Sequence, residues 1–181
     1  MTKEGLKKET ILTAAEIQAA LKRISSEILA QADTATPVVI VGIKNRGVPL
    51  AERVAKIVKK DLPNLELGSL DISLYRDDLD NLGSIASIQS TELPHDINGK
   101  RVILCDDVLF TGRTIRAAID AVMDFGRPSR IELAVLVDRG NRELPIAANY
   151  CGHQLETTHE DYISVRLKET DDEEGVFLLN D

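Results

Sequence analysis

The chain has 181 residues, of which 43% are hydrophobic and 29% are charged, and its formal net charge is -8. This composition is typical of one folded domain and excludes collagen-like, low-complexity and wholly disordered chains. The acidic balance also excludes a uniformly basic nucleic-acid binder, because contact with RNA would need a local basic surface.

Cysteine and histidine are scarce. Cys105 and Cys151 are the only cysteines, and they form no metal-binding spacing with the three histidines. Two cysteines are too few for a disulfide framework, and we expect no structural zinc. The N-terminal segment lacks the apolar core of a signal peptide, and no apolar run approaches the length of a membrane span. We therefore expect a cytoplasmic protein without membrane contact.

The first third of the chain predicts a helix, a strand and a second helix. Thr13 and Glu16 have the spacing of a capping box, and the apolar residues behind them predict a helix over residues 14–31. Residues 38–43 form a continuous apolar run rich in β-branched side chains, which is typical of a strand buried on both faces. A second helix starts at Gly47, with proline in its first turn.

The middle of the chain predicts two strands separated by a long connection. Residues 67–75 alternate between apolar and polar side chains, which predicts a strand with one less buried face. Residues 76–99 are polar and rich in turn-forming residues, and a connection of this length is too long for a passive loop. We expect a flexible lid with a functional role. Residues 101–105 then predict a buried strand, followed by an amphipathic helix that ends at Gly126.

The last third predicts further strands and an acidic end. Residues 131–137 predict a buried strand, and short strands are expected around Tyr150 and over residues 162–167. Residues 169–174 read as a solvated acidic turn without chemistry, within an acidic C-terminal segment over 169–181.

This alternation predicts one α/β domain over residues 1–181. Its mostly parallel central sheet should carry helices on both faces, with ligands bound where the strands end. Residues 44–47, 106–114 and 138–142 fall at such strand ends.

The segment after residue 105 carries the strongest chemical signal. Asp106 and Asp107 precede Thr111-Gly112-Arg113-Thr114 at the start of a predicted helix. A helix N-terminus offers unpaired N–H groups and positive charge, so these residues predict a phosphate site. The two carboxylates would repel phosphate and should face sugar hydroxyls, a metal ion or a developing cation; a ribose 5-phosphate satisfies both halves. Alternatively, the acidic pair only ends a strand and caps a turn.

Residues 102–114 resemble the phosphoribosyl pyrophosphate (PRPP) motif of the type I phosphoribosyltransferases. Residues 41–47, 71–78 and 134–146 resemble members of that family that are uracil phosphoribosyltransferases and also regulate pyrimidine genes through RNA, and the resemblance runs from about residue 10 to 168. It implies the type I phosphoribosyltransferase fold, with a small hood or flexible-loop region. The implied reaction converts uracil and PRPP into UMP and pyrophosphate, with Mg²⁺ held by the pyrophosphate rather than directly by the protein. It also implies a homodimer or homotetramer.

The resemblance assigns roles at the sugar and phosphate end of this substrate. Asp106 and Asp107 would stabilise the positive charge on the ribose. The PRPP-motif residues that would bind the substrate are Val108, Leu109, Phe110, Thr111, Gly112, Arg113 and Thr114. The pyrophosphate would be bound by Lys44, Asn45, Arg46, Gly47 and Arg76. The alternative is that Lys44 and Arg46 are surface charges beside a helix cap and that Arg76 belongs to a solvated loop.

Base selection is implied by the same comparison. An aspartate is found at the position of Phe110 in relatives that use 6-oxopurines, so an apolar ring favours uracil. Val137, Asp138 and Arg139 would build the base pocket. Val165 would cover the ring, or it is an ordinary strand residue. No general base is evident.

An RNA-binding role is also implied, with a pyrimidine-operon leader RNA bound in response to UMP or UTP. The candidate contacts are Arg23, Arg116 and Arg142, each of which reads equally as a solvated charge. Ala147 and His153 stand where RNA-binding relatives usually carry basic residues. Two alternatives to a uracil phosphoribosyltransferase therefore stay open: an RNA-binding attenuator that uses the site only as a nucleotide sensor, and a purine phosphoribosyltransferase.

Overall fold

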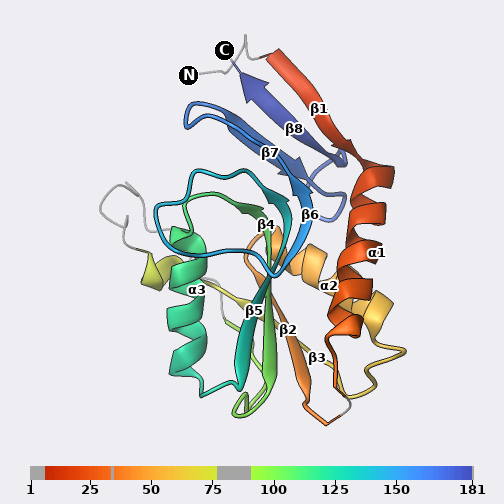
Figure 1. The fold of residues 1–181 in the computed structure, drawn as a ribbon, viewed down its shortest axis with the longest axis vertical. Helices are drawn as coiled ribbons and strands as arrows, with labels where there is room; N and C mark the ends of the chain where they lie inside the picture. Colours follow the sequence, from red (N-terminus) through yellow and green to blue (C-terminus); the bar gives the residue numbers. More distant parts are fainter. Residues whose placement is uncertain (1–6, 34, 77–90, 181) are drawn as a thin grey trace.

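The central element of the fold is a parallel sheet of five strands (Figure 1). The computed structural model describes residues 7–33, 35–76 and 91–180. The strands lie in the order β3-β2-β4-β5-β6, and every neighbouring pair is parallel. Their bounds are β2 Val38–Ile43, β3 Glu66–Leu70, β4 Arg101–Leu109, β5 Arg130–Asp138 and β6 Tyr150–Gln154.

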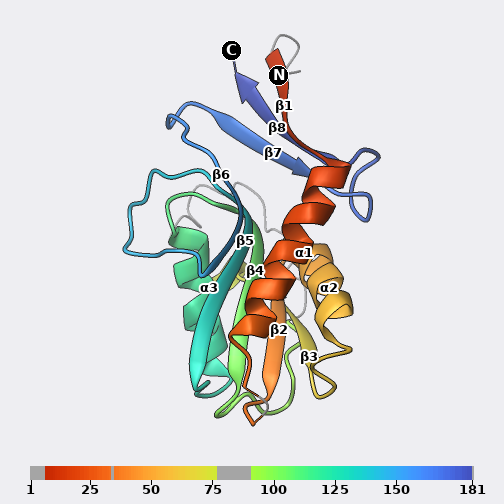
Figure 2. The same cartoon turned by 45° about the vertical axis from the view of Figure 1, so that its right-hand side comes forward.

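Helices cover both faces of this sheet, as predicted (Figure 2). Helices α1 (Ala14–Ala30) and α2 (Gly47–Val58) pack on one face, and α3 (Arg113–Asp124) packs on the other. Each face has its own apolar core, because the alternating side chains of β2 and β4 point to opposite sides. The predicted capping box is confirmed: the Thr13 N–H donates to Glu16 Oε2 at 2.8 Å, and the Glu16 N–H donates to Thr13 Oγ1 at 3.3 Å.

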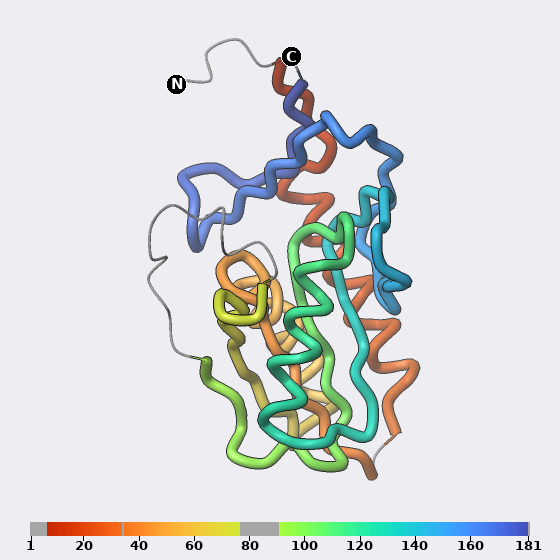
Figure 3. The backbone as a smooth tube through the Cα atoms, turned by 90° about the vertical axis from the view of Figure 1, so that its left-hand side faces the viewer, coloured from red at the N-terminus to blue at the C-terminus, as the bar shows by residue number. Residues whose placement is uncertain are grey.

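A second, antiparallel sheet forms a hood at the end of the molecule where the main strands finish (Figure 3). Its strands are β1 (Lys7–Thr13), β7 (Tyr162–Arg166) and β8 (Gly175–Asn180), in the order β1-β8-β7. The sequence did not predict β1 or β8. Within the acidic C-terminal segment expected over 169–181, residues 175–180 form an apolar strand that pairs along β1.

The strand predicted over residues 67–75 is wrong in its second half. β3 ends at Leu70, and Ser73–Tyr75 form a short 3-10 helix, η1. The Asp71 carboxylate accepts hydrogen bonds from the Ser73 N–H at 2.9 Å and from the Ser73 hydroxyl at 2.5 Å, and this local turn ends the strand.

The structure tests only the ends of the expected lid, because residues 77–90 lie outside the described residues. The returning segment joins β3 through a bridge between Ser69 and Glu92, and it buries Ile97 before β4 begins. No helix in the described ranges is long and apolar enough to cross a membrane.

Candidate active site at the C-terminal edge of the sheet

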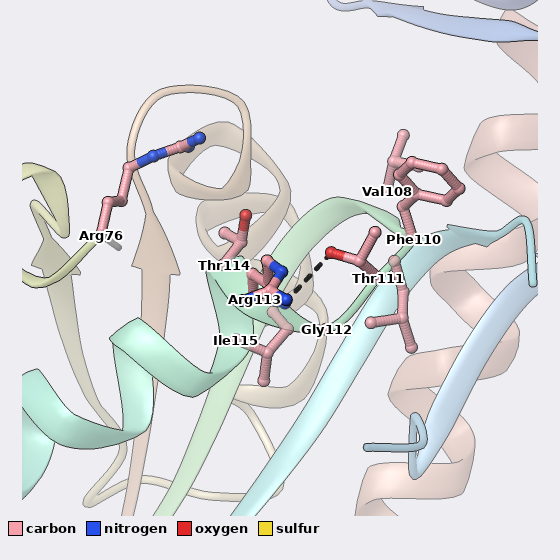
Figure 4. Close-up of a pocket in the computed structure, with 9 residues that line it drawn as sticks. Arg76, Val108, Phe110, Thr111, Gly112, Arg113, Thr114 and Ile115 are labelled. Atoms are coloured by element: carbon pink, nitrogen blue, oxygen red, sulfur yellow. Dashed lines mark hydrogen bonds between the residues drawn. The ribbon is translucent and has the colours of Figure 1, made fainter. Parts of the chain in front are cut away.

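A cavity of about 230 Å³ lies where β4 gives way to α3 (Figure 4). Gly112 has a φ of 94°, a left-handed conformation that favours glycine, and it immediately precedes the helix. The Arg113 N–H donates to Thr111 Oγ1 at 3.3 Å, which tightens the turn. The structure thus brings together the predicted PRPP-motif residues and Arg76. The lining residues are Arg76, Val108, Leu109, Phe110, Thr111, Gly112, Arg113, Thr114 and Ile115.

The loop after β5 holds this turn through hydrogen bonds to its backbone carbonyls. The N–H groups of Glu143 and Leu144 both donate to the Thr111 carbonyl, at 3.0 and 3.1 Å. The Arg142 guanidinium donates to the Phe110 carbonyl at 2.8 Å and to Asp138 Oδ2 at 2.5 Å. Arg142 therefore ties the end of β5 to the turn around the cavity.

The three candidate RNA contacts lie in three different segments of the chain. The Arg142 guanidinium donates to three backbone carbonyls and to Asp138, and its contact with RNA stays a prediction. Arg23 donates from α1 to the carbonyls of Cys151 and Gly152 at 3.0 and 2.5 Å. Arg116 is on α3, on the other face of the sheet, where it pairs with Asp120 at 2.7 Å.

Asp106 and Asp107 lie in the last part of β4, which extends four residues further than predicted. Asp106 is 7% exposed. Its Oδ1 accepts the Asp107 N–H at 2.9 Å, and Asp107 Oδ1 accepts the Val108 N–H at 2.9 Å. Burial raises the pKa of Asp106, and the charge of Asp107 raises it further. Burial also raises the pKa of Asp107, against the lowering effects of hydrogen bonds and of the Arg46 charge.

The loop between β2 and α2 lies directly against the backbone of Cys105 and Asp106. A Cβ atom on Gly47 would lie 2.3 Å from the Cys105 carbonyl oxygen, so only glycine allows this approach. The peptide bond between Lys44 and Asn45 is cis, and the Lys44 N–H donates to the Leu70 carbonyl at 3.0 Å. The residues predicted to bind pyrophosphate therefore lie next to those predicted to contact the ribose.

Arg46 has a partner that the sequence did not reveal. Its Nη2 and Nε atoms donate to the two carboxylate oxygens of Asp171, at 3.0 and 3.3 Å. These hydrogen bonds lower the pKa of Asp171 to about 2. The expectation that residues 169–174 are solvated is therefore wrong for Asp171 and Glu174, whose side chains are 16% and 5% exposed, whereas Glu169, Thr170 and Asp172 are exposed as expected. Other acids of this turn are also paired, since Arg53 Nη1 lies 2.7 Å from Glu174 Oε1.

Side chains around the end of β5 gather at Phe110. The Arg139 guanidinium lies over the Phe110 ring, 4.0 Å from its centre, and the His159 ring lies 5.3 Å from the same centre. Arg139 is 5% exposed and donates to Thr157 Oγ1 at 2.9 Å and to the Thr158 carbonyl at 2.6 Å. Burial lowers the pKa of Arg139. Thr157, Thr158 and His159 carry no sequence signal, because the segment containing them is irregular.

Two predicted base-pocket residues belong to the core. Val137 is fully buried in β5 and can offer only its backbone to a ligand. Val165 is 2% exposed, packs in the core on the side of α1 and α2, and does not line the cavity. Val165 is thus a buried residue of β7, and its proposed contact with the base stays a prediction.

The acidic side chains at this edge do not form a metal site by themselves. Within the described ranges, no three His, Cys, Asp or Glu side chains come close enough to hold a metal ion. The two adjacent carboxylates of Asp106 and Asp107 can supply oxygen ligands, which suit Mg²⁺, but a complete shell needs oxygens from a ligand.

Comparison with known proteins places this arrangement in a family. Residues 8–169 match the model of the phosphoribosyl transferase domain. The chain is 52% identical to the bifunctional protein PyrR of Chloroflexus aurantiacus, over 93% of both chains. It is 51% identical to the protein of the same name from Oceanobacillus iheyensis, over 95% of this chain and 97% of that one.

Solved structures agree with this assignment. A hypoxanthine phosphoribosyltransferase from Trypanosoma cruzi superposes with a TM-score of 0.73 at 16% identity, over 98% of this chain and 97% of that one. A hypoxanthine-guanine phosphoribosyltransferase from Bacillus anthracis gives 0.71 at 16% identity, over 96% and 97%. Identities this low show the fold alone, which is the predicted type I phosphoribosyltransferase fold. The chain therefore belongs to the phosphoribosyltransferase family and, within it, to the group of bifunctional PyrR proteins.

Proposed function

We propose that this protein is a uracil phosphoribosyltransferase, which converts uracil and PRPP into UMP and pyrophosphate. One observation carries the proposal: two adjacent carboxylates, the buried Asp106 and the half-buried Asp107, end the strand that leads into a glycine turn and a helix N-terminus lining one cavity. The turn at residues 111–114 suits the dianionic 5-phosphate, because a helix N-terminus attracts negative charge. The carboxylates suit the ribose.

The role of the carboxylates follows from the charge that develops during the reaction. As the bond between C1 of the ribose and the pyrophosphate breaks, the pyrophosphate leaves with the electron pair and positive charge builds on the ring. Asp106 and Asp107 would stabilise that charge. N1 of uracil then bonds to C1, and its proton passes to water or to the departing pyrophosphate. Their raised pKa values mean that a proton is retained more readily before substrate binds. A nearby cation favours the ionised form, so stabilisation is strongest when the ring is charged.

The leaving group would be bound by the loop of Lys44, Asn45, Arg46 and Gly47, and by Arg76. Figure 4 shows the Arg76 side chain extending toward the side of the cavity where Thr114 lies. Mg²⁺ is part of the proposal: it would be held by pyrophosphate oxygens rather than directly by the protein. When bound, it would neutralise charge on the leaving group.

The base would lie beside the Phe110 and Arg139 pair, against the backbone of Val137 and Asp138. The Arg139 guanidinium stacks on the Phe110 ring and occupies part of the space beside the proposed base site. The apolar ring at position 110 also offers no carboxylate to a purine. Uracil is therefore favoured over guanine or hypoxanthine.

The test is uracil-dependent release of pyrophosphate by Asp107→Asn. We expect turnover to fall by about 10²- to 10³-fold, as when one electrostatic contact to a transition state is removed. The matched control is Asp172→Asn, an exposed acid that makes no ion pair within the described ranges and should keep wild-type turnover. Wild-type turnover in Asp107→Asn would reject the carboxylate role. Turnover of guanine or hypoxanthine in preference to uracil would favour the purine alternative.

We also propose that the protein binds pyrimidine-operon leader RNA in response to UMP or UTP. This is favoured by the similarity, at about 50% identity, to relatives that are named as bifunctional proteins. Arg23 and Arg116 remain candidate contacts, since both keep exposed guanidinium surface. A gel-shift titration with and without UMP tests it, and absence of nucleotide-dependent binding at low salt would reject it. RNA binding without turnover would support the nucleotide-sensor alternative.

The remaining parts of the proposal concern organisation. We place the reaction in the cytoplasm, in a single domain over residues 1–181 whose lid spans 76–99, and we expect a homodimer or homotetramer. Exposed apolar side chains on η1 and at the end of α3 support association, namely Leu74, Met123 and Phe125. Light scattering of the purified protein checks the assembly, and a monomeric mass would contradict it.

A further inference from the structure

We call residues 44–47, which are proposed to bind pyrophosphate, the pyrophosphate loop. The ion pair between Arg46 and Asp171 connects this loop to the turn between the hood strands β7 and β8. The bond is a fork, in which Nε and Nη2 of Arg46 each face one carboxylate oxygen of Asp171. Such paired bonds fix the plane of a guanidinium as well as its position. Among the described residues, Nη1 and the second hydrogen of Nη2 have no other hydrogen-bond acceptor, so the pair does not have to break for Arg46 to bind phosphate oxygens.

Asp171 is itself fixed before any substrate arrives. Its Oδ2 accepts the Leu167 N–H at 3.1 Å and the Thr170 hydroxyl at 2.8 Å. The Thr170 and Asp171 N–H groups donate back to the Leu167 carbonyl at 3.0 and 2.7 Å, which closes the turn. The carboxylate therefore has a defined place relative to the end of β7.

The turn that carries Asp171 is also attached to helix α2. Arg53 Nη2 donates to Glu169 Oε2 at 2.7 Å, and Arg53 Nη1 donates to Glu174 Oε1 at 2.7 Å. Glu169 and Glu174 flank Asp171, so both sides of the turn are bonded to α2, the helix that begins at the end of the pyrophosphate loop. The loop and the turn are therefore held together by hydrogen bonds through α2 as well as through Arg46.

Arg46 would have another partner if Asp171 were absent. The charge of Arg46 acts on Asp107, so a released guanidinium would be drawn toward the carboxylate proposed to stabilise the ribose cation, or into water. Either position would remove it from the leaving group. The long arginine side chain would also lose conformational freedom when it bound pyrophosphate, and a guanidinium that is already ordered avoids that cost.

We propose that Asp171 is a positioning residue that holds Arg46 at the pyrophosphate loop, so that the guanidinium is in place when the diphosphate of PRPP binds. The inference rests on the proposed function, because it assigns the diphosphate to this loop. It adds a residue outside the PRPP motif, from a turn more than 120 residues away along the chain.

The test compares the kinetic constants of Asp171→Asn with those of wild type. The amide keeps a hydrogen-bond acceptor but loses the charge and the fork. We expect KM for PRPP to rise about tenfold, as when the partner that orients a binding group is removed, while KM for uracil and kcat stay within about twofold. Asp171→Glu, which keeps the charge, should recover most of the affinity. Asp172→Asn should behave as wild type. An unchanged or lower KM for PRPP in Asp171→Asn would overturn the inference.

A double variant checks that Asp171 acts through Arg46. In an Arg46→Gln background, Asp171→Asn should raise KM for PRPP no further. A further rise of the same size as in wild type would show that Asp171 acts by another route, and would overturn the inference.

Calorimetric titration with magnesium pyrophosphate separates this inference from the proposed function. We expect Asp171→Asn to bind pyrophosphate about tenfold more weakly than wild type. If wild type fails to convert uracil but this difference is found, only the proposed function fails. If wild type converts uracil and both proteins bind pyrophosphate equally, only the role of Asp171 fails.

Discussion

The two ends of β4 and β5 hold buried charges in opposite ways. Where the strands begin, Arg101 and Glu132 are almost fully buried and paired, with Arg101 Nε 2.5 Å from Glu132 Oε2. Arg101 Nη2 also donates to the Tyr150 hydroxyl at 2.7 Å. Where β4 finishes, Asp106 and Asp107 place two like charges side by side in a buried position, and their pKa values are raised.

This difference separates the end that serves stability from the end proposed to bind the substrate. A buried charge is tolerated when a partner of opposite sign compensates the loss of water. The Asp pair lacks such a partner on its own strand, and its free energy improves when a cationic group approaches. Unfavourable arrangements of this kind are concentrated at functional sites, whereas well-paired ones are not.

The largest effect should come from breaking the pair where the strands begin. Arg101→Met leaves the Glu132 charge buried without its main partner, and we expect the free energy of unfolding to fall by about 3–5 kcal/mol. Urea unfolding followed by circular dichroism measures it. Replacing both charges, in Arg101→Met with Glu132→Leu, should recover part of the loss. A single variant as stable as wild type would remove the contrast between the two ends.

The next largest effect is expected at the C-terminal end of β4, where Asp106 lies. Asp106→Asn should lower uracil-dependent turnover by about 10²- to 10³-fold, because a charge near the ribose is lost. The free energy of unfolding should rise, because burying a neutral amide costs less than burying a carboxylate. Turnover assays and thermal unfolding of the same preparation test both. An active but destabilised variant would mean that this end also serves stability.

The pH dependence of the same variant gives the sign of the carboxyl's contribution. The raised pKa means that the folded state keeps a proton that the unfolded state has released above about pH 4. The contribution of Asp106 to stability is therefore complete below about pH 4 and is lost as the pH rises through the folded pKa. The free energy of unfolding of Asp106→Asn should therefore increase relative to that of wild type as the pH rises from about 4 through the folded pKa. Unfolding experiments at several pH values measure this difference. A parallel dependence in both proteins would contradict the raised pKa.

A smaller effect is expected at the turn of the cavity. Gly112→Ala places a Cβ in a left-handed conformation and should cost about 1–2 kcal/mol of stability. Gly99→Ala is a matched control, because Gly99 has a φ of 68° and open space around it. Although it is the last residue of the proposed lid, its N–H donates to the Arg127 carbonyl near the start of β4, at the end of that strand opposite the cavity. Both variants should lose similar stability in urea, but only Gly112→Ala should raise KM for PRPP. Equal KM values would argue against phosphate binding at this turn.

The smallest effect should follow removal of an exposed pair. Arg116 and Asp120 have side chains that are 46% and 47% exposed. Arg116→Gln should cost only about 0.3–0.5 kcal/mol, because water screens the interaction. Urea unfolding beside Arg101→Met tests whether burial, and not the presence of a pair, decides the energy. A loss as large as that of Arg101→Met would reject this explanation.

The sequence predicted the elements whose pattern is local. The apolar run at 38–43 and the capping box at Thr13 depend on neighbouring residues, and both were confirmed. The motif at residues 106–114 was located for the same reason, and the structure brings its residues to one cavity.

The features missed depend on residues far apart in the chain. β1 has mostly exposed side chains and becomes a strand because it pairs with β8, more than 160 residues later. The bond from Arg46 to Asp171 and the contact of His159 with Phe110 likewise arise only after folding. The early end of β3 had a local cause, the turn at Asp71, which the alternating pattern of residues 67–75 concealed.

The pairing of β1 with β8 has a consequence for how the protein is made. Ribosomes deliver the chain from its N-terminus, so α1, the parallel sheet and the turn at Gly112 are all synthesised before residues 175–180 emerge. Until then β1 has no neighbouring strand, and the segment that carries Asp171 lacks its connection to β8. A nascent polypeptide thus contains the turn at Gly112 well before Asp171 is available to Arg46, and β1 gains its neighbouring strand only after residues 175–180 are translated.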